Sequence, residues 1–231
     1  MFGFFDPKYF IFVGPAILLA MWAQWKVKHA YSVGNRHRAS SGLSGAETAQ
    51  RILNAYGVVN VAIEPVRSFL GDHYDSSQKV LRLSPEVYNG RTLSALGIAA
   101  HEVGHALQDA TNYGPLTIRN GLVPLASVGS NLSIILVIAG IIINMTGVAI
   151  AGLALFGTVV LFQMINLPVE FNASSRAREI LLTQGMVTQE EDVVVGKVLS
   201  AAAMTYVAAT ITAVMTLLYY ASIVFGGHRR S

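Results

Sequence analysis

The chain has 231 residues, a net charge of +3 and no cysteine, and only 13% of its residues are charged. Soluble domains usually carry about 25% charged residues, so this composition is typical of a membrane protein. The small net charge gives no support for nucleic-acid binding, and the lack of cysteine excludes disulfides and thiolate metal sites, which leaves His, Asp and Glu as possible ligands.

The first predicted element is a membrane span near residues 9–25, a stretch without any charged residue or histidine. Two tryptophans and then two lysines end this stretch: Trp22, Trp25, Lys26 and Lys28. Such an order is typical of an anchor at the membrane interface. A cleaved signal peptide is the alternative, but the start is poorly basic and no small-x-small cleavage site follows. We therefore expect residues 1–28 to be an N-terminal transmembrane anchor.

Residues 29–120 are the one sizeable polar segment, and we expect them to form helix, strand, strand and helix in that order. The first helix begins at a capping box formed by Ser44 and Glu47 and stops at Gly57. Apolar and polar residues then alternate in "VVNVAIEPV" (58–66), which predicts a strand.

The second half of this segment contains the other strand and the other helix. We expect "SFLGDHYDSS" (68–77) to be a loop and "KVLRLS" (79–84) to be a short strand, which is also a candidate edge for a bound peptide. A helix from about Thr92 to Asp109 follows, and it contains the sequence "AAHEVGHALQ".

Two histidines in this helix stand four residues apart, with a glutamate directly after the first. Helix geometry places His101 and His105 on one face, about 5–6 Å apart, where both imidazoles can bind one zinc ion. Glu102 is rotated away by about 100°, so it is expected to reach a zinc-bound water and not the ion. In HExxH metallopeptidases this glutamate is the general base.

A run of 50 residues without charge or histidine, 120–169, comes next. A spanning helix needs about 20 apolar residues, so the run predicts a hairpin of two spans near 122–143 and 147–166. The sequence "NMTG" (144–147) is the expected turn. We take residues 121–167 as this transmembrane hairpin.

A catalytic zinc needs a third protein ligand, and six residues are candidates: Asp72, His73, Asp75, Asp109, Glu170 and Glu179. Glu170 is favoured because an even number of spans returns the chain to the side of the two histidines. We expect it near the start of a helix over 168–185, where the helix N-terminus favours a carboxylate. An ordinary carboxylate at a helix start is the alternative. Residues 168–200 are thus the segment that carries the third ligand.

The last predicted elements are a helix that starts at a capping pattern of Thr188 and Glu191 and a fourth span near 202–224. The span lies in an uncharged stretch, 198–227, and residues 201–231 are its segment with the tail. The chain is therefore expected to be mainly α-helical, with about four transmembrane helices and a small α+β domain at the membrane surface.

These residues resemble the gluzincin pattern of metallopeptidases, which has two histidines and a downstream glutamate. Membrane-integral gluzincins have the form Glu-x-x-Ala-Asp; Glu170 and Ala173 match it, but Ser174 stands where the aspartate would be. The chain is most similar to the YugP-like family of neutral zinc metallopeptidases, over the first anchor, "GDHYD", "AAHEVGHALQ" and "LPVEFNASSRA". The resemblance implies a zincin-like (gluzincin) domain and peptidase chemistry, but no substrate.

The expected activity is zinc-dependent hydrolysis of peptide bonds in protein or peptide substrates at the membrane surface. One zinc ion would be held by His101, His105 and Glu170, with Glu102 as the general base. A further group usually stabilises the oxyanion, and there are four candidates: His73, Tyr74, Arg176 and Tyr206. For each of them loop packing, a surface ion pair or a membrane-interface position is the plainer alternative. Asn172 and Asp109 are candidates to support the metal ligands from behind, although for Asn172 an ordinary place on the helix surface is equally plausible.

Three other functions are alternatives to a peptidase at the membrane surface. An intramembrane protease would need a Leu-Asp-Gly segment, which the sequence lacks, and a zinc transporter would need ionisable residues inside the spans. A non-catalytic zinc-binding scaffold or assembly factor stays open as the alternative, and Glu102 discriminates against it because a scaffold needs no acid beside the first ligand.

The positive-inside rule predicts the orientation. Four basic residues follow the first span: Lys26, Lys28, Arg36 and Arg38. They place the HExxH segment on the cytoplasmic side of a bacterial cytoplasmic membrane. Four spans then put the C-terminus outside, which conflicts with its basic end "HRRS" (228–231). The lipid bilayer and the substrate are the expected partners; the sequence leaves the oligomeric state open.

Overall fold

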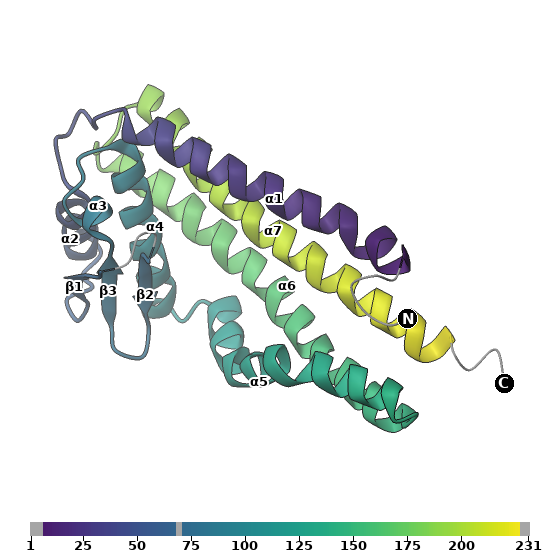
Figure 1. Ribbon diagram of the computed structural model, residues 1–231. Coiled ribbons are helices and arrows are strands. Elements are labelled where there is room, and N and C mark those ends of the chain that lie inside the picture. Colours follow the sequence, from purple (N-terminus) through teal and green to yellow (C-terminus); the bar gives the residue numbers. More distant parts are fainter. Residues whose placement is uncertain (1–6, 68–70, 227–231) are drawn as a thin grey trace. The chain divides into compact units, whose positions relative to one another are not determined.

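The computed structural model describes residues 7–67 and 71–226. The elements in chain order are α1 (Pro7–Asn35), α2 (Gly45–Ala55), β1 (Ala62–Pro65), β2 (His73–Asp75), β3 (Val80–Leu83), α3 (Pro85–Tyr88), α4 (Leu93–Ala110), α5 (Gly114–Ile142), α6 (Thr146–Thr183) and α7 (Gln189–Gly226) (Figure 1). Four of these helices, α1, α5, α6 and α7, are long and apolar enough to cross a membrane. The expected class, a mainly α membrane protein with a small α+β part, is confirmed.

The chain divides into two compact units, and all four long helices contribute to both. The first unit contains 1–23, 118–167 and 205–231, and the second contains 24–117 and 168–204. The first therefore holds the apolar helical stretches, whereas the second holds the sheet, α2, α3 and α4.

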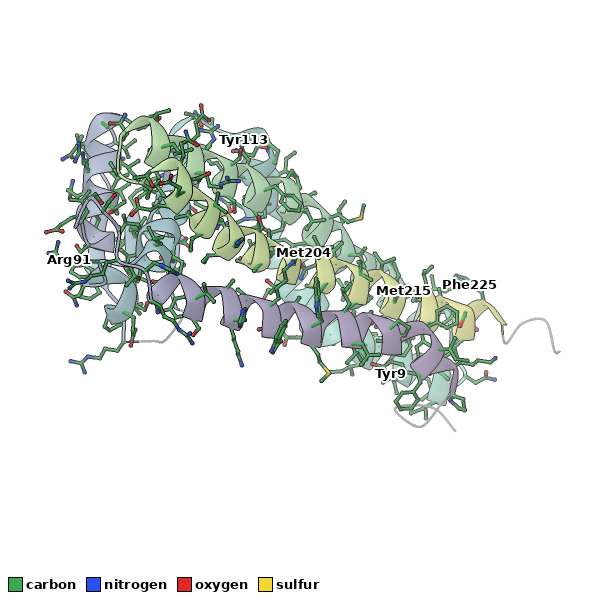
Figure 2. All side chains as sticks on the ribbon, turned by 90° about the horizontal axis from the view of Figure 1, so that it is seen from above. Tyr9, Arg91, Tyr113, Met204, Met215 and Phe225 are labelled. Carbon is green, nitrogen blue, oxygen red and sulfur yellow. The ribbon has the colours of Figure 1, made fainter. Side chains whose placement is uncertain are left out.

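In the first unit, the apolar parts of α5 and α6 form the expected hairpin. The helices are joined at residues 143–145, where Asn144 has a positive φ of 57°. Gly152 allows close approach, because a Cβ there would lie 2.6 Å from the backbone nitrogen of Val137. Tyr9 near the start of α1 packs against Tyr219 near the end of α7, with ring centroids 5.1 Å apart. Tyr9 and Phe225 accordingly lie at the same end of this unit (Figure 2).

In the second unit, α4 is the central helix. It packs against α2, α3, β2 and β3, and its residues Leu96, Ala99 and Val103 are fully buried. The apolar cluster around it also includes Leu181 of α6 and Val195 of α7. The helix that carries the HExxH sequence is thus held on several sides by apolar contacts, which makes it a rigid support.

The three-stranded sheet has the order β1-β3-β2, so β3 is its central strand. The expectation that residues 79–84 form an edge is therefore wrong. β3 pairs in parallel with β1 and antiparallel with β2, where Tyr74 lies opposite Leu81. The edge nearest to α4 is β2, because β2 contacts that helix.

β2 itself was expected to be part of a loop, and this too is wrong. A three-residue strand is too short to show a period of two. It is fixed instead by a tight turn, in which Asp75 accepts hydrogen bonds from the backbone N–H groups of Ser77 and Gln78 and Lys79 has a φ of 55°. Residues 68–70 of the expected loop lie outside the described residues. β1 is shorter than the expected strand over 58–66, and Val59 before it is 88% exposed.

The second half of α6 also differs from expectation. The helix continues from Thr146 to Thr183 without a break, with Pro168 inside it. We expected a new helix to begin at this proline, because proline removes one backbone hydrogen bond and usually ends a helix; long membrane helices tolerate such a loss. Glu170 is therefore an interior helical residue, and the expected support from a helix N-terminus is wrong. The expected capping boxes at Ser44 and at Thr188 are both formed.

Candidate active site

The two histidines of α4 lie on the face of the helix that meets α6. Their rings are 4.8 Å apart between centroids and nearly perpendicular, at 83°. Between them in sequence, Gly104 lies against the backbone of Ala173, and a Cβ at this glycine would come within 2.9 Å of the Ala173 carbonyl oxygen. The small residue brings α4 and α6 close enough for one carboxylate to reach both histidines.

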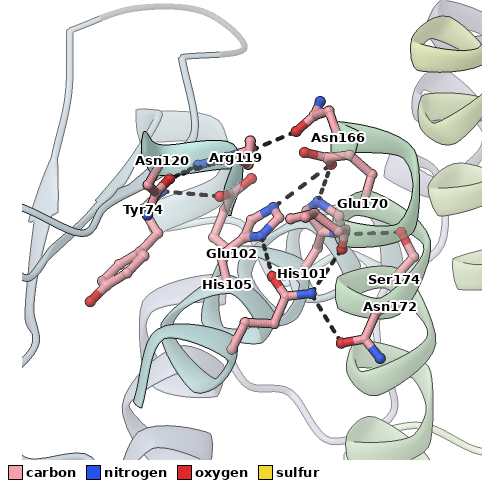
Figure 3. A network of polar contacts seen from close by, with 12 residues as sticks. Tyr74, His101, Glu102, His105, Arg119, Asn120, Asn166, Glu170, Asn172 and Ser174 are labelled. Atoms are coloured by element: carbon pink, nitrogen blue, oxygen red, sulfur yellow. Dashed lines mark hydrogen bonds and ion pairs between the residues drawn. The ribbon is translucent and has the colours of Figure 1, made fainter. Parts of the chain in front are cut away.

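That carboxylate belongs to Glu170. Its Oε2 atom lies 3.3 Å from Nε2 of His101 and 3.7 Å from Nε2 of His105, and the three side chains converge in Figure 3. One candidate ligand atom from each residue lies within 4.8 Å of the other two. Of the six candidates for the third ligand, Glu170 alone joins the two histidines in such a group within the part of the chain that the structure describes.

This group fits a zinc ion. Ligand atoms of a tetrahedral zinc site lie about 3.3 Å apart, given bonds of about 2.0–2.1 Å, which is close to the observed separations between Glu170 and the two histidines. Oε2 of Glu170 is buried and accepts no hydrogen bond from the described residues. A buried acceptor without a donor is costly, and a cation bound here removes that cost.

The electrostatics of the group also favour a cation. Burial raises the pKa of Glu170, but contacts with both histidines outweigh this effect and hold the pKa well below its usual range. Burial lowers the pKa of His105, but the carboxylates of Glu170 and Glu102 outweigh it, and the net direction is upward. The chain therefore keeps a negative charge buried between two imidazoles.

Each histidine is held from behind by a side chain that sequence reasoning did not assign. Nδ1 of His105 lies 3.0 Å from Oε1 of Gln108, which is fully buried. The amide nitrogen of Gln108 donates to the carbonyl oxygen of Val169, directly before Glu170. Gln108 therefore positions one ligand and the backbone of another. Its place three residues after His105, on the same helix face, was a signal that could have identified it.

His101 has a different support, Ser174. Its Oγ lies 3.1 Å from Nδ1 of His101. If Nε2 binds a zinc ion, Nδ1 carries the proton and its N–H donates a hydrogen bond to the hydroxyl oxygen. Ser174 thus contacts the candidate ligand with a neutral group.

Glu102 lies beside the group and is 9% exposed. Its Oε2 accepts a hydrogen bond of 3.1 Å from the backbone N–H of Tyr74, so edge strand β2 and the expected general base are in direct contact. The phenol of Tyr74 donates to Asp109 at 2.7 Å, and Asp109 also pairs with Lys79 at 2.5 Å. Asp109 therefore holds β2 and the following turn onto α4, and it does not contact a histidine ligand.

The remaining candidates have other contacts. Asn172 accepts hydrogen bonds from Gln108 and from Arg176, so it supports the histidines only through Gln108. Arg176 also lies over the ring of Tyr113, 5.8 Å from its centroid. The exposed His73 lies 2.7 Å from the carbonyl oxygen of Gly71. Tyr206 belongs to the first unit.

The other acids considered as ligands are bound elsewhere or exposed. Asp72 accepts hydrogen bonds from the backbone and the hydroxyl of Ser84, and Asp75 closes the turn after β2. Glu179 is exposed on α6.

Comparison with known proteins places these residues in a family. A family profile described as "Putative neutral zinc metallopeptidase" matches residues 9–225. The chain belongs to this family. The match includes the three grouped residues and all four long helices. The expected resemblance to YugP-like zinc metallopeptidases is confirmed, and zinc is the metal that the family description implies.

A curated relative agrees with the family assignment. The "Putative membrane protease YugP" of Bacillus subtilis (strain 168) is 46% identical over 219 residues, which cover 94% of this chain and 97% of the relative. No solved structure matches the chain.

Proposed function

We propose that the protein is a zinc-dependent membrane peptidase of the gluzincin type, which cleaves peptide bonds at the membrane surface. The observation that carries the proposal is the convergence of two histidines and one buried carboxylate, Glu170, with Glu102 beside them. His101, His105 and Glu170 would hold a single zinc ion. When bound, zinc supplies Lewis-acid chemistry, since it polarises a carbonyl and makes water more acidic.

Glu102 would move the proton. The N–H of Tyr74 fixes Oε2 of its carboxylate, and the other oxygen is the one that takes a proton from the attacking water. The same carboxyl group then delivers the proton to the departing amine. A site that only stores or senses metal needs no proton acceptor beside its ligands, and the contact with Tyr74 occupies only one oxygen of Glu102.

The substrate would lie along β2. This strand pairs with β3 on one side only, and the backbone N–H of its middle residue, Tyr74, points to Glu102. An extended peptide beside a sheet edge is held by main-chain hydrogen bonds. Because the N–H of Tyr74 is already donated to Glu102, the peptide would bond to the remaining backbone groups of this edge, and its backbone would pass the general base. This arrangement supports a peptide or unfolded protein segment as the substrate.

The position of Glu170 supports action at the membrane surface. It follows the long uncharged run of the chain directly, on the same helix that carries the third predicted span. The third ligand is thus within about one helical turn of the end of the apolar stretch. Substrates near the bilayer, including parts of membrane proteins, are the class that this placement favours.

The test is the substitution Glu102→Gln in the purified full-length protein. We expect the variant to retain its zinc, measured by elemental analysis, and to lose about 10²–10⁴-fold in cleavage of a quenched fluorescent peptide library, because general acid–base catalysis contributes that much. Glu86→Gln, an exposed acid on α3, is the matched control and should cleave normally.

The alternative, a zinc-binding scaffold, predicts a different outcome. The wild type would bind zinc without cleaving any peptide. A deletion strain that expresses the Glu102→Gln variant would regain the full wild-type phenotype. That pair of results would reject the peptidase proposal.

A further inference from the structure

The second unit contains a cavity of about 530 Å³, and none of the zinc-site residues lines it. Its walls come from the last turns of α1, from α6 and from the first turns of α7. The lining residues are Lys26, His29, Ala30, Val33, Arg178, Val193, Val194, Gly196, Lys197 and Ser200.

The polar lining of the cavity is basic. Three basic side chains line it, namely Lys26, Arg178 and Lys197, and no acid does. Arg178 pairs with Asp192 at 2.5 Å, and Asp192 itself is buried and does not line the cavity. The charged groups of the lining are therefore all basic. An anion is the ligand that complements it.

The cavity also lies beside the ends of the apolar stretches of two helices, α1 and α7. Lys26 is the first charge after the apolar stretch of α1, and Lys197 is the last charge before the apolar stretch of α7. Trp25 stacks on His29, with ring centroids 5.5 Å apart and planes 12° apart, and tryptophan is enriched at the level of lipid headgroups. Both helices therefore pass from the cavity directly into the segments that cross the bilayer.

We propose that this cavity binds the phosphate-bearing headgroup of an anionic phospholipid. The lysines would face the phosphate, the valines and Ala30 would contact the glycerol and upper chain atoms, and the acyl chains would extend into the bilayer. A free phosphate ion lacks the apolar part that matches the lining, and an acidic peptide would have to leave the water to lie at this level. An anionic phospholipid matches both the basic and the apolar residues of the lining, because its phosphate is attached to acyl chains.

The experiment uses the delipidated full-length protein in detergent and measures bound lipid by native mass spectrometry. Phosphatidylglycerol should bind more tightly than zwitterionic phosphatidylcholine. Lys26→Gln with Lys197→Gln should weaken phosphatidylglycerol binding about thirtyfold, because each basic side chain near an anionic headgroup contributes about fivefold. Ala30→Phe, which fills the cavity without a change in charge, should weaken it as well.

The controls separate a built site from diffuse attraction. Lys28→Gln with Arg36→Gln also removes two charges, one near the end of α1 and one directly after it, but neither residue lines the cavity, and this variant should lose less than threefold. Equal losses for the two charge pairs together with no effect of Ala30→Phe would overturn the proposal. Displacement of the bound lipid by inorganic phosphate would also overturn the proposal. The zinc content of each variant shows that it is folded, independently of any peptidase activity.

Discussion

Ser174 supports a metal ligand with a neutral hydroxyl, where membrane gluzincins with the Glu-x-x-Ala-Asp pattern have an aspartate. A carboxylate behind a histidine raises the basicity of the ring and tightens its bond to the metal, and a hydroxyl does so less. The contact with His101 is nevertheless formed at 3.1 Å. The serine therefore orients the ring without adding a charge to a site that already contains Glu102 and Glu170.

The substitution Ser174→Ala should lower zinc affinity about tenfold, at the lower end of what removal of such a supporting contact costs. The affinity is measured by competition with a fluorescent zinc chelator. Ser175→Ala changes the next residue, which is exposed, and should bind zinc like the wild type. Equal affinities for all three proteins would show that His101 is oriented by other contacts.

At this scale the sequence predicted the group of His101, His105 and Glu170 that the structure brings together, but not the side chains that hold it. The two histidines followed from helix geometry, and Glu170 followed from the count of spans. Gln108 was missed because its spacing from His105 marks only the helix face, and the burial of its amide between α4 and α6 shows only in the packing. Asn172 was a candidate for direct contact with a histidine ligand, but Gln108 lies between Asn172 and His105. Only the packing of α4 on α6 shows this.

At the scale of elements, the contact of α4 with α6 assembles the site. The histidines come from one helix and the third ligand from the other, and Gly104 sets the distance between them. A side chain there meets backbone atoms of Ala173, which cannot rotate away. The metal site is therefore sensitive to the separation of two helices as well as to its own residues.

Gly104→Ala should lower the free energy of unfolding by about 1–3 kcal/mol, the usual cost of overpacking, and should weaken zinc binding because Glu170 moves away from the histidines. Thermal unfolding with and without zinc measures both effects. Gly97→Ala on the same helix meets only the side chain of Val195, at 3.0 Å, and should cost less and leave zinc affinity unchanged. A normal zinc affinity in Gly104→Ala would argue against close helix contact as the device that sets the site.

The start of α7 is fixed by one carboxylate. Glu191 accepts hydrogen bonds from the backbone and the hydroxyl of Ser40 and from the backbone N–H of Thr188. Burial raises its pKa, but these hydrogen bonds outweigh burial, and the net direction is downward. Its contribution to stability is therefore full above the unfolded pKa of about 4.3 and is lost as the pH falls through the lower folded value.

The difference in stability between the wild type and Glu191→Gln should accordingly be largest near neutral pH and shrink as the medium is acidified below about pH 4.3. Thermal unfolding across this range measures it. Glu190→Gln, which changes the exposed neighbouring residue, should show a smaller difference at neutral pH. A difference that grows on acidification would contradict the assigned role.

The sequence also predicted elements unequally, for reasons that can be named. Long uncharged runs identified the spans, and capping boxes identified the starts of α2 and α7. The strand at 73–75 was missed because its pairing depends on a side-chain turn at Asp75. The continuity of α6 was missed because local rules assign a proline to a helix end, whereas the packing of the whole helix keeps Pro168 inside it.

At the scale of the whole molecule, we propose that the site lies on the cytoplasmic side of the membrane, because four basic residues follow the apolar part of α1. The last helix supports a full crossing. Its uncharged part within α7, residues 198–226, is about 43 Å long by helix geometry, which exceeds the hydrocarbon core of about 30 Å. The basic end "HRRS" lies outside the described residues.

Single cysteines test this orientation cleanly, because the chain has none of its own. In intact cells an impermeant thiol reagent should label a cysteine added after Ser231 and should not label Glu190→Cys. Labelling of both after the cells are opened is the control. If both stay protected in intact cells, the last helix does not cross the membrane. If only Glu190→Cys reacts, the whole orientation is reversed.

The unbroken course of α6 makes the third ligand part of a rod that is also embedded in lipid. A tilt, shift or rotation of such a rod moves every side chain on it, and Oε2 of Glu170 lies only 3.3 Å and 3.7 Å from the two imidazoles, so a small movement takes the carboxylate out of reach of a fixed imidazole pair. Membranes of different thickness push and tilt such rods to different degrees. Hydrolysis by this protein would then depend on which membrane surrounds it, before any substrate arrives.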